Sequence, residues 1–203
     1  MKGNVYTLCY AGALGTVCAL LLTAVAKITE PYKEANAEAE RSHNILNVLQ
    51  VPYPSKASSQ QLVKIFEENV RSEHLGKLKI YRYIPPKDSD SSETVAVGFE
   101  GPGLWGPVKG FLALGKDMRT IVGITFYEQE ETPGLGGEIV SSWFREQFAG
   151  KSIVDEAGNP GIIISKREGS APNKVDAISG ATMTCNKVQA MLNEAIKSIV
   201  EEK

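Results

Sequence analysis

The feature that most constrains this chain is an uncharged apolar run near its N-terminus. Residues 3–26 contain no Asp, Glu, Lys or Arg. A helix needs about 20 apolar residues to cross the hydrocarbon core of a bilayer, so this run is long enough to do so. The sequence therefore predicts a transmembrane helix in contact with membrane lipid over residues 1–28, followed by a water-exposed remainder.

A cleaved signal peptide is the competing interpretation of the same run. Ala24, Val25 and Ala26 resemble the small-residue site at which signal peptides are cut. However, the run is longer than the usual signal core of about 7–15 residues, and Lys2 is the only basic residue before it. The anchor is therefore the favoured interpretation.

Small side chains recur at every fourth position of this run, at Thr7, Ala11, Gly15, Ala19 and Thr23. Such a stripe lets membrane helices pack closely, although small residues are common in membrane helices in general. Both interpretations stay open. Lysines lie on both sides of the run, so the sequence does not specify its orientation.

Composition excludes several classes of function. The chain has 203 residues, 42% of them hydrophobic, which is enough for one membrane helix and one globular domain. Its net charge is -2 and its basic residues are scattered, so nucleic-acid binding is not expected. No glycine-rich dinucleotide or nucleotide-triphosphate motif is present, and His43 and His74 lie outside any hydrolytic or metal-binding motif. We therefore assign no catalytic and no metal-binding residue.

The three cysteines do not form a disulfide framework. Cys9 and Cys18 lie inside the apolar run, which leaves Cys185 alone in the rest of the chain. One cysteine cannot ligate an iron–sulfur cluster by itself, although a cluster shared between subunits stays open. We expect Cys185 to be a small packing residue rather than a redox thiol.

Two helices are expected between the apolar run and the first strand. Pro31 predicts a helix break, after which residues 33–50 form a charged helix within a stalk or linker over residues 29–57. The run from Ser58 to Gln61 resembles a capping box that opens a second helix. The predicted apolar face of that helix is Leu62, Ile65, Phe66 and Val70.

The pattern then changes to strands. Segments rich in β-branched and aromatic residues alternate with turn signals, and residues 85–92 form a polar loop. The predicted strands are residues 77–84, 94–99, 108–114, 120–127 and 161–165. Short strands in series with flanking helices predict an α+β fold with a mainly antiparallel sheet, over a domain of residues 58–203.

A last amphipathic helix follows the strands and begins near Thr184. Its apolar stripe consists of Val188, Met191, Leu192, Ala195, Ile196, Ile199 and Val200. Before it, the run from Asp176 to Thr184 offers three hydroxyls beside Gly180 and Ala181. Free N–H groups and the helix dipole favour a phosphate at such a helix start. The alternative is that Ser179, Thr182 or Thr184 only caps the helix.

The spacing Asp-x-x-Ser-Gly-Ala-Thr resembles the flavinylation motif of a family of FMN-binding domains. These domains occur in the C subunit of the Na+-translocating NADH:quinone oxidoreductase and in the G subunit of the related Rnf complex. The resemblance implies that FMN is esterified through its phosphate to Thr182, with Thr184 as the fallback acceptor. The other motif positions fall on Asp176, Ser179, Gly180 and Ala181.

Two further segments are similar to this family and occur in its order. The run from Gly103 to Gly106 is similar to a stretch of the Na+-pump subunit, and the run from Glu131 to Gly136 is similar to a signature shared by both complexes. The family often has a histidine shortly before the second segment. Gln129 stands there instead, which puts any role of that histidine in doubt.

The second segment has the residues of a tight turn, which exposes backbone N–H groups able to bond the N and O edge of a flavin ring. We expect Glu131, Thr132, Gly134, Leu135 and Gly136 to lie near the flavin. An ordinary strand-to-helix loop is the alternative, and the acidic residues around Glu131 suit a solvated turn. Trp105 either packs on the flavin or covers the end of a hairpin over the core.

The resemblance implies a membrane-anchored electron-transfer subunit that carries covalent FMN within a Na+-translocating NADH:quinone oxidoreductase. Implied partners are other membrane subunits, including an iron–sulfur donor and a flavin-bearing acceptor, and a flavin transferase for maturation. The implied location is the bacterial inner membrane, with a cytoplasmic N-terminus and a periplasmic domain. The alternatives are the equivalent Rnf protein, a flavin-free assembly module and a flavin reductase with noncovalent FMN.

Overall fold

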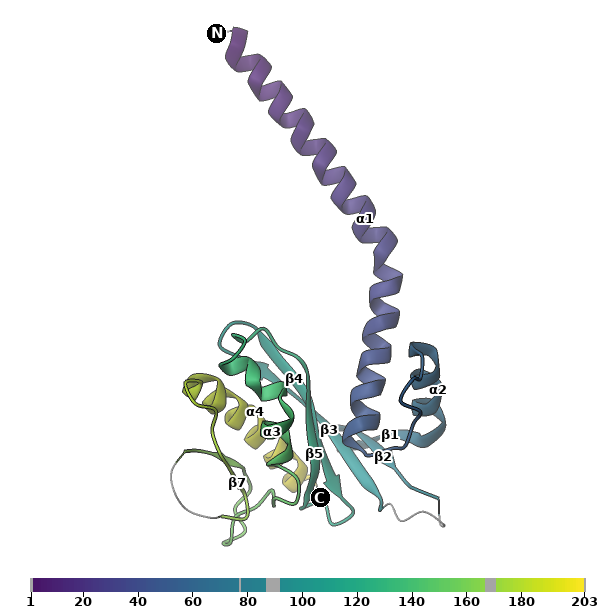
Figure 1. The fold of residues 1–203 in the computed structure, drawn as a ribbon, viewed down its shortest axis with the longest axis vertical. Helices are drawn as coiled ribbons and strands as arrows, with labels where there is room; N and C mark the ends of the chain where they lie inside the picture. Colours follow the sequence, from purple (N-terminus) through teal and green to yellow (C-terminus); the bar gives the residue numbers. More distant parts are fainter. Residues whose placement is uncertain (1, 77, 87–91, 167–170, 203) are drawn as a thin grey trace. The chain divides into compact units, whose positions relative to one another are not determined.

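The computed structural model of the chain describes residues 2–76, 78–86, 92–166 and 171–202 (Figure 1). These form two compact units, Met1–Ala39 and Glu40–Lys203. Most of the predicted polar loop at residues 85–92 lies outside the described residues.

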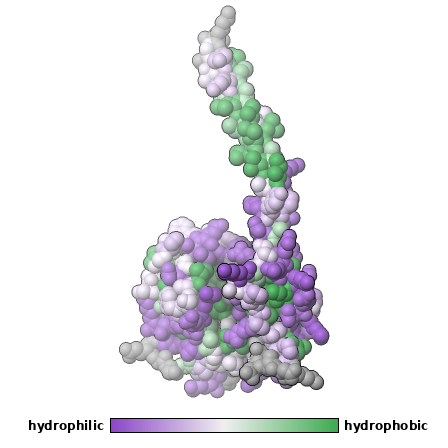
Figure 2. Space-filling view, turned by 45° about the vertical axis from the view of Figure 1, so that its right-hand side comes forward, coloured by the Kyte–Doolittle hydropathy of each residue, from purple (hydrophilic) through white to green (hydrophobic). Residues whose placement is uncertain are grey.

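The first unit is the N-terminal part of helix α1 (Lys2–Val48). The segment Val5–Val48 contains a window of mean hydropathy 2.0, so the helix is long and apolar enough to cross a membrane. Figure 2 shows apolar surface gathered along this helix. The hydroxyls of Thr7, Thr16 and Thr23 donate to backbone carbonyls four residues earlier. Their polar groups are thus satisfied within the helix, as an apolar environment requires.

The predicted helix break at Pro31 is wrong, because α1 continues through it. A proline inside a helix removes one hydrogen bond and costs ~3 kcal/mol. Residues 33–40 include three alanines and three glutamates, which have high helix propensity and favour continuation. The residues expected as a separate helix are therefore the second half of α1.

The second unit contains a five-stranded antiparallel sheet in the order β1-β2-β3-β4-β5. The strands are β1 (Val70–Leu75), β2 (Leu78–Tyr83), β3 (Thr94–Pro102), β4 (Pro107–Gly115) and β5 (Ile121–Glu128). The α+β fold with a mainly antiparallel sheet is confirmed. Strand β1 was not predicted, because four of its six residues are polar and they follow no strand pattern.

The predicted capping box opens helix α2 (Ser59–Asn69). The Ser58 side chain accepts from the N–H of Gln61, and the Gln61 side chain accepts from the N–H of Ser58. The helix ends one residue earlier than its predicted apolar face. Val70, expected on that face, instead begins β1 and pairs with Tyr83.

The sheet separates two hydrophobic cores. On one face, Tyr81, Ala96 and Phe111 pack with α2 and with Ile45, Leu46 and Leu49 from the end of α1. The other face packs against helix η1 (Gly136–Val140), α3 (Ser142–Glu146) and α4 (Thr182–Glu201). Figure 1 shows α3 and α4 together on that face. The helix α4 is therefore held directly against the sheet.

A short parallel pair, β6 (Ile163–Ile164) and β7 (Lys174–Val175), leads the chain to the start of α4. The predicted strand at residues 161–165 is thus mostly coil around two strand residues. Two side chains of α4 hold this segment: Asn193 accepts from the N–H of Ile162, and Gln189 accepts from the N–H of Ile164, both at 2.7 Å. These bonds hold the segment before the run from Asp176 to Thr184 against α4.

Candidate functional site

Three segments that are far apart in the sequence meet at one cavity of ≈190 Å³ in the second unit. They are the β3–β4 loop, the segment after β5 and the first turn of α4. The lining residues are Leu104, Glu131, Thr132, Leu135, Gly136, Gly180, Ala181, Thr182, Met183 and Thr184. The structure therefore brings together the three segments that the sequence singled out.

No side chain among the described residues caps the first turn of α4. The helix begins at Thr182, two residues before the predicted start, and its N-cap is Ala181, which makes no side-chain cap hydrogen bond. The interpretation that a hydroxyl of the motif caps this helix is therefore wrong. The first N–H groups of a helix lack intrahelical acceptors, so this turn can donate to an anion, and the helix dipole favours one there.

The two candidate acceptor threonines have opposite environments. Thr182 is exposed, and its hydroxyl makes no hydrogen bond within the described part of the chain. The Thr184 side chain is only 2% exposed, and its hydroxyl donates to Oε2 of Glu131 at 2.5 Å. Of the two, Thr182 therefore presents the accessible hydroxyl.

Glu131 is buried rather than solvated, contrary to the expectation of a solvated turn. Its Oε1 accepts from the N–H groups of Leu104 at 2.6 Å and Trp105 at 3.2 Å. Its own N–H donates to Oε1 of Gln129 at 2.7 Å. Gln129, where the resembled family often has histidine, thus supports the backbone of this turn.

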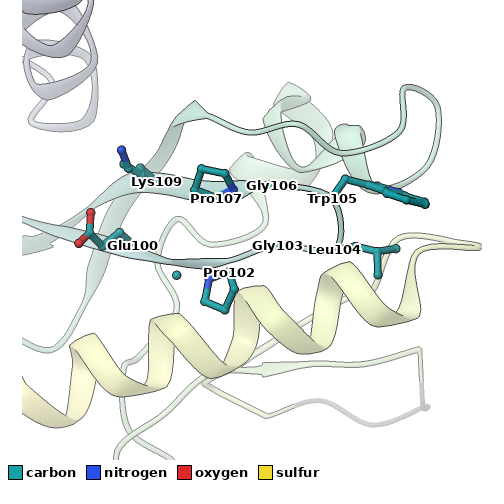
Figure 3. A pocket seen from close by; sticks show the side chains of 9 residues that line it. Glu100, Pro102, Gly103, Leu104, Trp105, Gly106, Pro107 and Lys109 are labelled. Atoms are coloured by element: carbon teal, nitrogen blue, oxygen red, sulfur yellow. The ribbon is translucent and has the colours of Figure 1, made fainter.

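The tip of the β3–β4 hairpin presents two apolar side chains. The loop is closed by a 2.7 Å hydrogen bond from the N–H of Gly103 to the carbonyl of Gly106. Figure 3 shows Leu104 and Trp105 at the tip, pointing away from the strands. Leu104 lines the ≈190 Å³ cavity, whereas Trp105 lines a wider depression of ≈760 Å³ and is 70% exposed. Trp105 therefore does not cover the core.

Two residues of the predicted motif lie beside the cavity rather than in its lining. Asp176 is exposed, and its N–H donates to Oε1 of Gln147. Ser179 is exposed, and its hydroxyl accepts from Nζ of Lys166 at 2.7 Å. Lys166 was not predicted as a site residue, because its position 13 residues before Ser179 gives no periodic signal. The parallel β6–β7 pairing brings the two residues together.

The glycines of the site allow close approach of its backbone. Gly180 has φ +79, which favours glycine, and a Cβ there would lie 3.0 Å from Cδ2 of Leu135. The N–H groups at the start of α4 and the Lys166 ammonium group are donors for phosphate oxygens, and the exposed Thr182 hydroxyl is the oxygen available for an ester bond. The residues present therefore fit the phosphate end of FMN.

Cys185 lies directly behind the site and is 1% exposed. Its sulfur accepts from the N–H of Ile178 at 3.4 Å, and burial raises the pKa of its thiol. These observations support the packing role. Among the described residues, no group of three or more His, Cys, Asp or Glu side chains is placed to hold a metal ion.

Known FMN-binding proteins are similar to this chain in sequence. Residues 103–197 match the family of FMN-binding domains. The chain is 45% identical over 107 residues to the C subunit of Na(+)-translocating NADH-quinone reductase from Vibrio vulnificus, and 42% identical over 113 residues to that from Yersinia pestis. These matches cover 51% and 55% of this chain but only 41% and 42% of the relatives. The chain thus matches about two fifths of the length of these relatives.

Solved structures share the fold. A crystal structure of the C subunit of Na(+)-translocating NADH-quinone reductase from Parabacteroides distasonis superposes with a TM-score of 0.70 at 24% identity, covering 84% of this chain and 94% of that one. The Shewanella oneidensis NqrC structure gives 0.67 at 21% identity, covering 83% and 98%. Residues 103–197 of this chain are therefore similar to FMN-binding domains, and the chain is similar in sequence and fold to the C subunit of Na(+)-translocating NADH-quinone reductase.

Proposed function

We propose that this protein is a membrane-anchored electron-transfer subunit that carries FMN in a phosphoester bond to Thr182. The observation that carries the proposal is the position of this residue. Thr182 lies at the uncapped first turn of α4, beside the cavity where the three segments meet, and its exposed hydroxyl has no hydrogen bond among the described residues. Thr184, the fallback acceptor, is buried and its hydroxyl is already bonded to Glu131.

Attachment requires only a transfer of the FMN phosphoryl group, with FAD as the donor and a flavin transferase as the catalyst. The Thr182 oxygen forms a bond to the phosphorus that bears the flavin. The bond from this phosphorus to the bridging oxygen of FAD breaks, and AMP leaves with the electron pair. The hydroxyl proton passes to a base of the transferase or to water. No oxidant or reductant is consumed.

The residues around Thr182 have distinct roles in this proposal. The free N–H groups at the start of α4 donate to the phosphate oxygens, and Lys166 supplies a positive charge beside them. Gly180 keeps the approach open. Leu104, Leu135 and Thr132 line the cavity for the ring system, and the exposed Trp105 provides an aromatic face next to it.

When bound, FMN would supply the redox chemistry, because no side chain lining this site is itself an electron carrier. The chain would hold and orient the cofactor and shape its electrostatic surroundings. A covalent bond suits a carrier on an aqueous surface, since a reversibly bound cofactor is lost when its partners separate. The names of the homologues point to an NADH-quinone reductase that translocates Na+.

Helix α1 would anchor the protein in the bacterial inner membrane, with the N-terminus in the cytoplasm and the second unit on the periplasmic face. This rests on the length and hydropathy of the helix and on the membrane location of the resembled complex. The partners would be the other membrane subunits, among them an iron–sulfur donor and a flavin-bearing acceptor. Because the chain matches only part of the relatives' length, these partners and the Na+ transport belong to the proposal.

The test is the intact mass of the full chain after co-expression with a flavin transferase. Wild type and Thr184→Ala should carry one added FMN, and Thr182→Ala should carry none. Added FMN on Thr182→Ala but not on Thr184→Ala would move the acceptor to Thr184. A flavin released from wild type by acid precipitation would show noncovalent binding, and wild type without flavin would favour an assembly module.

A further inference from the structure

We propose that Glu131 is a positioning residue, which ties the Trp105 loop to the first turn of α4 and does not bind the flavin itself. This role of Glu131 rests on the function proposed above, although the hydrogen bonds of Glu131 lie within this chain and do not depend on FMN. Glu131 is buried to 4% exposure at the point where the three segments meet.

Both oxygens of the Glu131 carboxylate are already occupied. Oε1 accepts two backbone N–H groups from the β3–β4 loop, those of Leu104 and Trp105. Oε2 accepts the hydroxyl of Thr184, which is itself buried on α4. One side chain therefore joins the hairpin tip to the start of the helix. A carboxylate with three donors has little capacity left for a ligand.

The position of the Glu131 carboxylate explains why glycine stands at two positions of the site. A Cβ at Gly103 would overlap Oε1 of Glu131. A Cβ at Gly136 would lie 2.7 Å from Oε2 of Glu131 and 2.5 Å from Oγ1 of Thr184. Neither glycine has a positive φ, so backbone conformation does not require them. Their lack of a side chain makes room for Glu131 and its partners.

This arrangement sets where the aromatic side chain of the loop lies. Trp105 is 70% exposed, so core packing does not hold it. The loop instead depends on its own closing hydrogen bond, from Gly103 to Gly106, and on the two N–H bonds to Glu131. Without the Glu131 carboxylate the loop keeps its internal bond but loses its attachment to the rest of the site.

The test compares three forms of the full chain without flavin, solubilised in detergent: wild type, Glu131→Ala and Glu131→Gln. Amide hydrogen exchange is followed by NMR at Leu104 and Trp105, with the Gly103 amide as internal control. Glu131→Ala should speed exchange at Leu104 and Trp105 by about tenfold or more, because their acceptor is lost. Gln keeps an acceptor oxygen for both N–H groups and should change exchange by less than about threefold.

Equal exchange of Leu104 and Trp105 in wild type and Glu131→Ala would overturn the proposal. If Glu131→Ala does not fold, Glu131→Asp makes the same test, because its shorter side chain cannot reach both the loop and Thr184. These measurements need no flavin. A chain that never receives FMN would therefore refute the proposed function and leave this inference to be judged on the exchange data.

A second readout uses the flavin-loaded protein. Glu131→Gln keeps the shape of the side chain and removes a buried negative charge beside the cavity. Reduction adds negative charge to a flavin, so the midpoint potential should shift upward in Glu131→Gln. Trp105 should keep its place, so the ratio of FMN to protein should equal that of wild type. An unchanged potential together with unchanged exchange in Glu131→Ala would assign Glu131 to fold stability only.

Discussion

The hydroxyl of Thr184 donates to Oε2 of Glu131 at 2.5 Å, across 53 positions of the sequence. This contact separates the roles of the two threonines at the start of α4. Thr184 is part of the buried framework of the site, whereas Thr182, two residues earlier, faces solvent. The contact also links the segment after β5 to the helix that would bear the cofactor.

The two threonines should respond differently to isosteric substitution. Thr184→Val leaves Oε2 of buried Glu131 without its donor, so the free energy of unfolding should fall by ~1–3 kcal/mol. Thr182→Val changes an exposed side chain and should stay within ~0.5 kcal/mol of wild type. Urea denaturation followed by circular dichroism measures both. Thr184→Ser keeps the hydroxyl and is the matched control; a loss in Thr184→Ser as large as that in Thr184→Val would assign the effect to the methyl group.

Gly134 and Gly136 allow steric crowding to be separated from backbone strain. Gly134 has φ +75, and a Cβ there would meet no heavy atom within 4 Å, so Gly134→Ala should cost only the conformational penalty of ~1 kcal/mol. A Cβ at Gly136 would instead press on Thr184 and Glu131. We expect Gly136→Ala to cost ~2–3 kcal/mol and to lower the yield of attached FMN.

Thermal unfolding and the ratio of FMN to protein distinguish these two glycine variants. Gly134→Ala should bind as much FMN as wild type, since the space around the cavity does not change. Equal losses in both variants would argue against a steric role of Gly136.

Cys185 should give stability a specific dependence on alkaline pH. Burial raises the pKa of its thiol above the value in the unfolded chain. The contribution of this group is therefore complete below the unfolded pKa of about 8.5 and is lost as pH rises through the folded pKa. Cys185→Ala should be less stable than wild type at pH 7, and this difference should narrow as the pH is raised above about 9.

Denaturation curves of wild type and Cys185→Ala across this pH range make the comparison. Cys9 and Cys18 are present in both proteins, so their titration cancels in the difference. A constant difference at all pH values would show that the Cys185 thiol titrates normally.

The parts of the site that sequence reasoning identified are those with local signals. The hydroxyl-rich run ending at Thr184 and the two glycine-rich segments are visible as motifs, and the capping box at Ser58 is a local pattern that the structure confirms. The prediction at Pro31 was wrong because the break rule competes with the helix propensity of the alanines and glutamates that follow it. Strand β1 was missed because its polar residues carry no strand pattern.

The contacts of Glu131 and Lys166 could not be predicted from local sequence patterns. Glu131 meets Leu104 only because β3 and β4 form a hairpin whose tip returns beside the end of β5. Lys166 meets Ser179 only through the short parallel pairing of β6 with β7. Both contacts depend on strand register, which a single sequence of this kind does not specify.

Lys166 is a cation whose side chain contacts the motif just before Thr182. Its ammonium group bonds to the hydroxyl of Ser179 at 2.7 Å. A charged donor contributes up to ~1.5–3 kcal/mol to phosphate binding, and solvent screening of an exposed lysine reduces this. Lys166→Gln should therefore slow FMN attachment roughly 3- to 10-fold without changing the final mass.

The measurement is the half-time of FMN attachment to purified, flavin-free full chain, with FAD and a flavin transferase supplied. Lys116→Gln is the matched control, since it removes the same charge from an exposed lysine just after β4. Added salt should slow wild type and bring it toward the rate of Lys166→Gln, because screening weakens the same attraction. Equal half-times for the two variants would mean that Lys166 acts only through net charge, and the phosphate would then depend on the N–H groups of α4 alone.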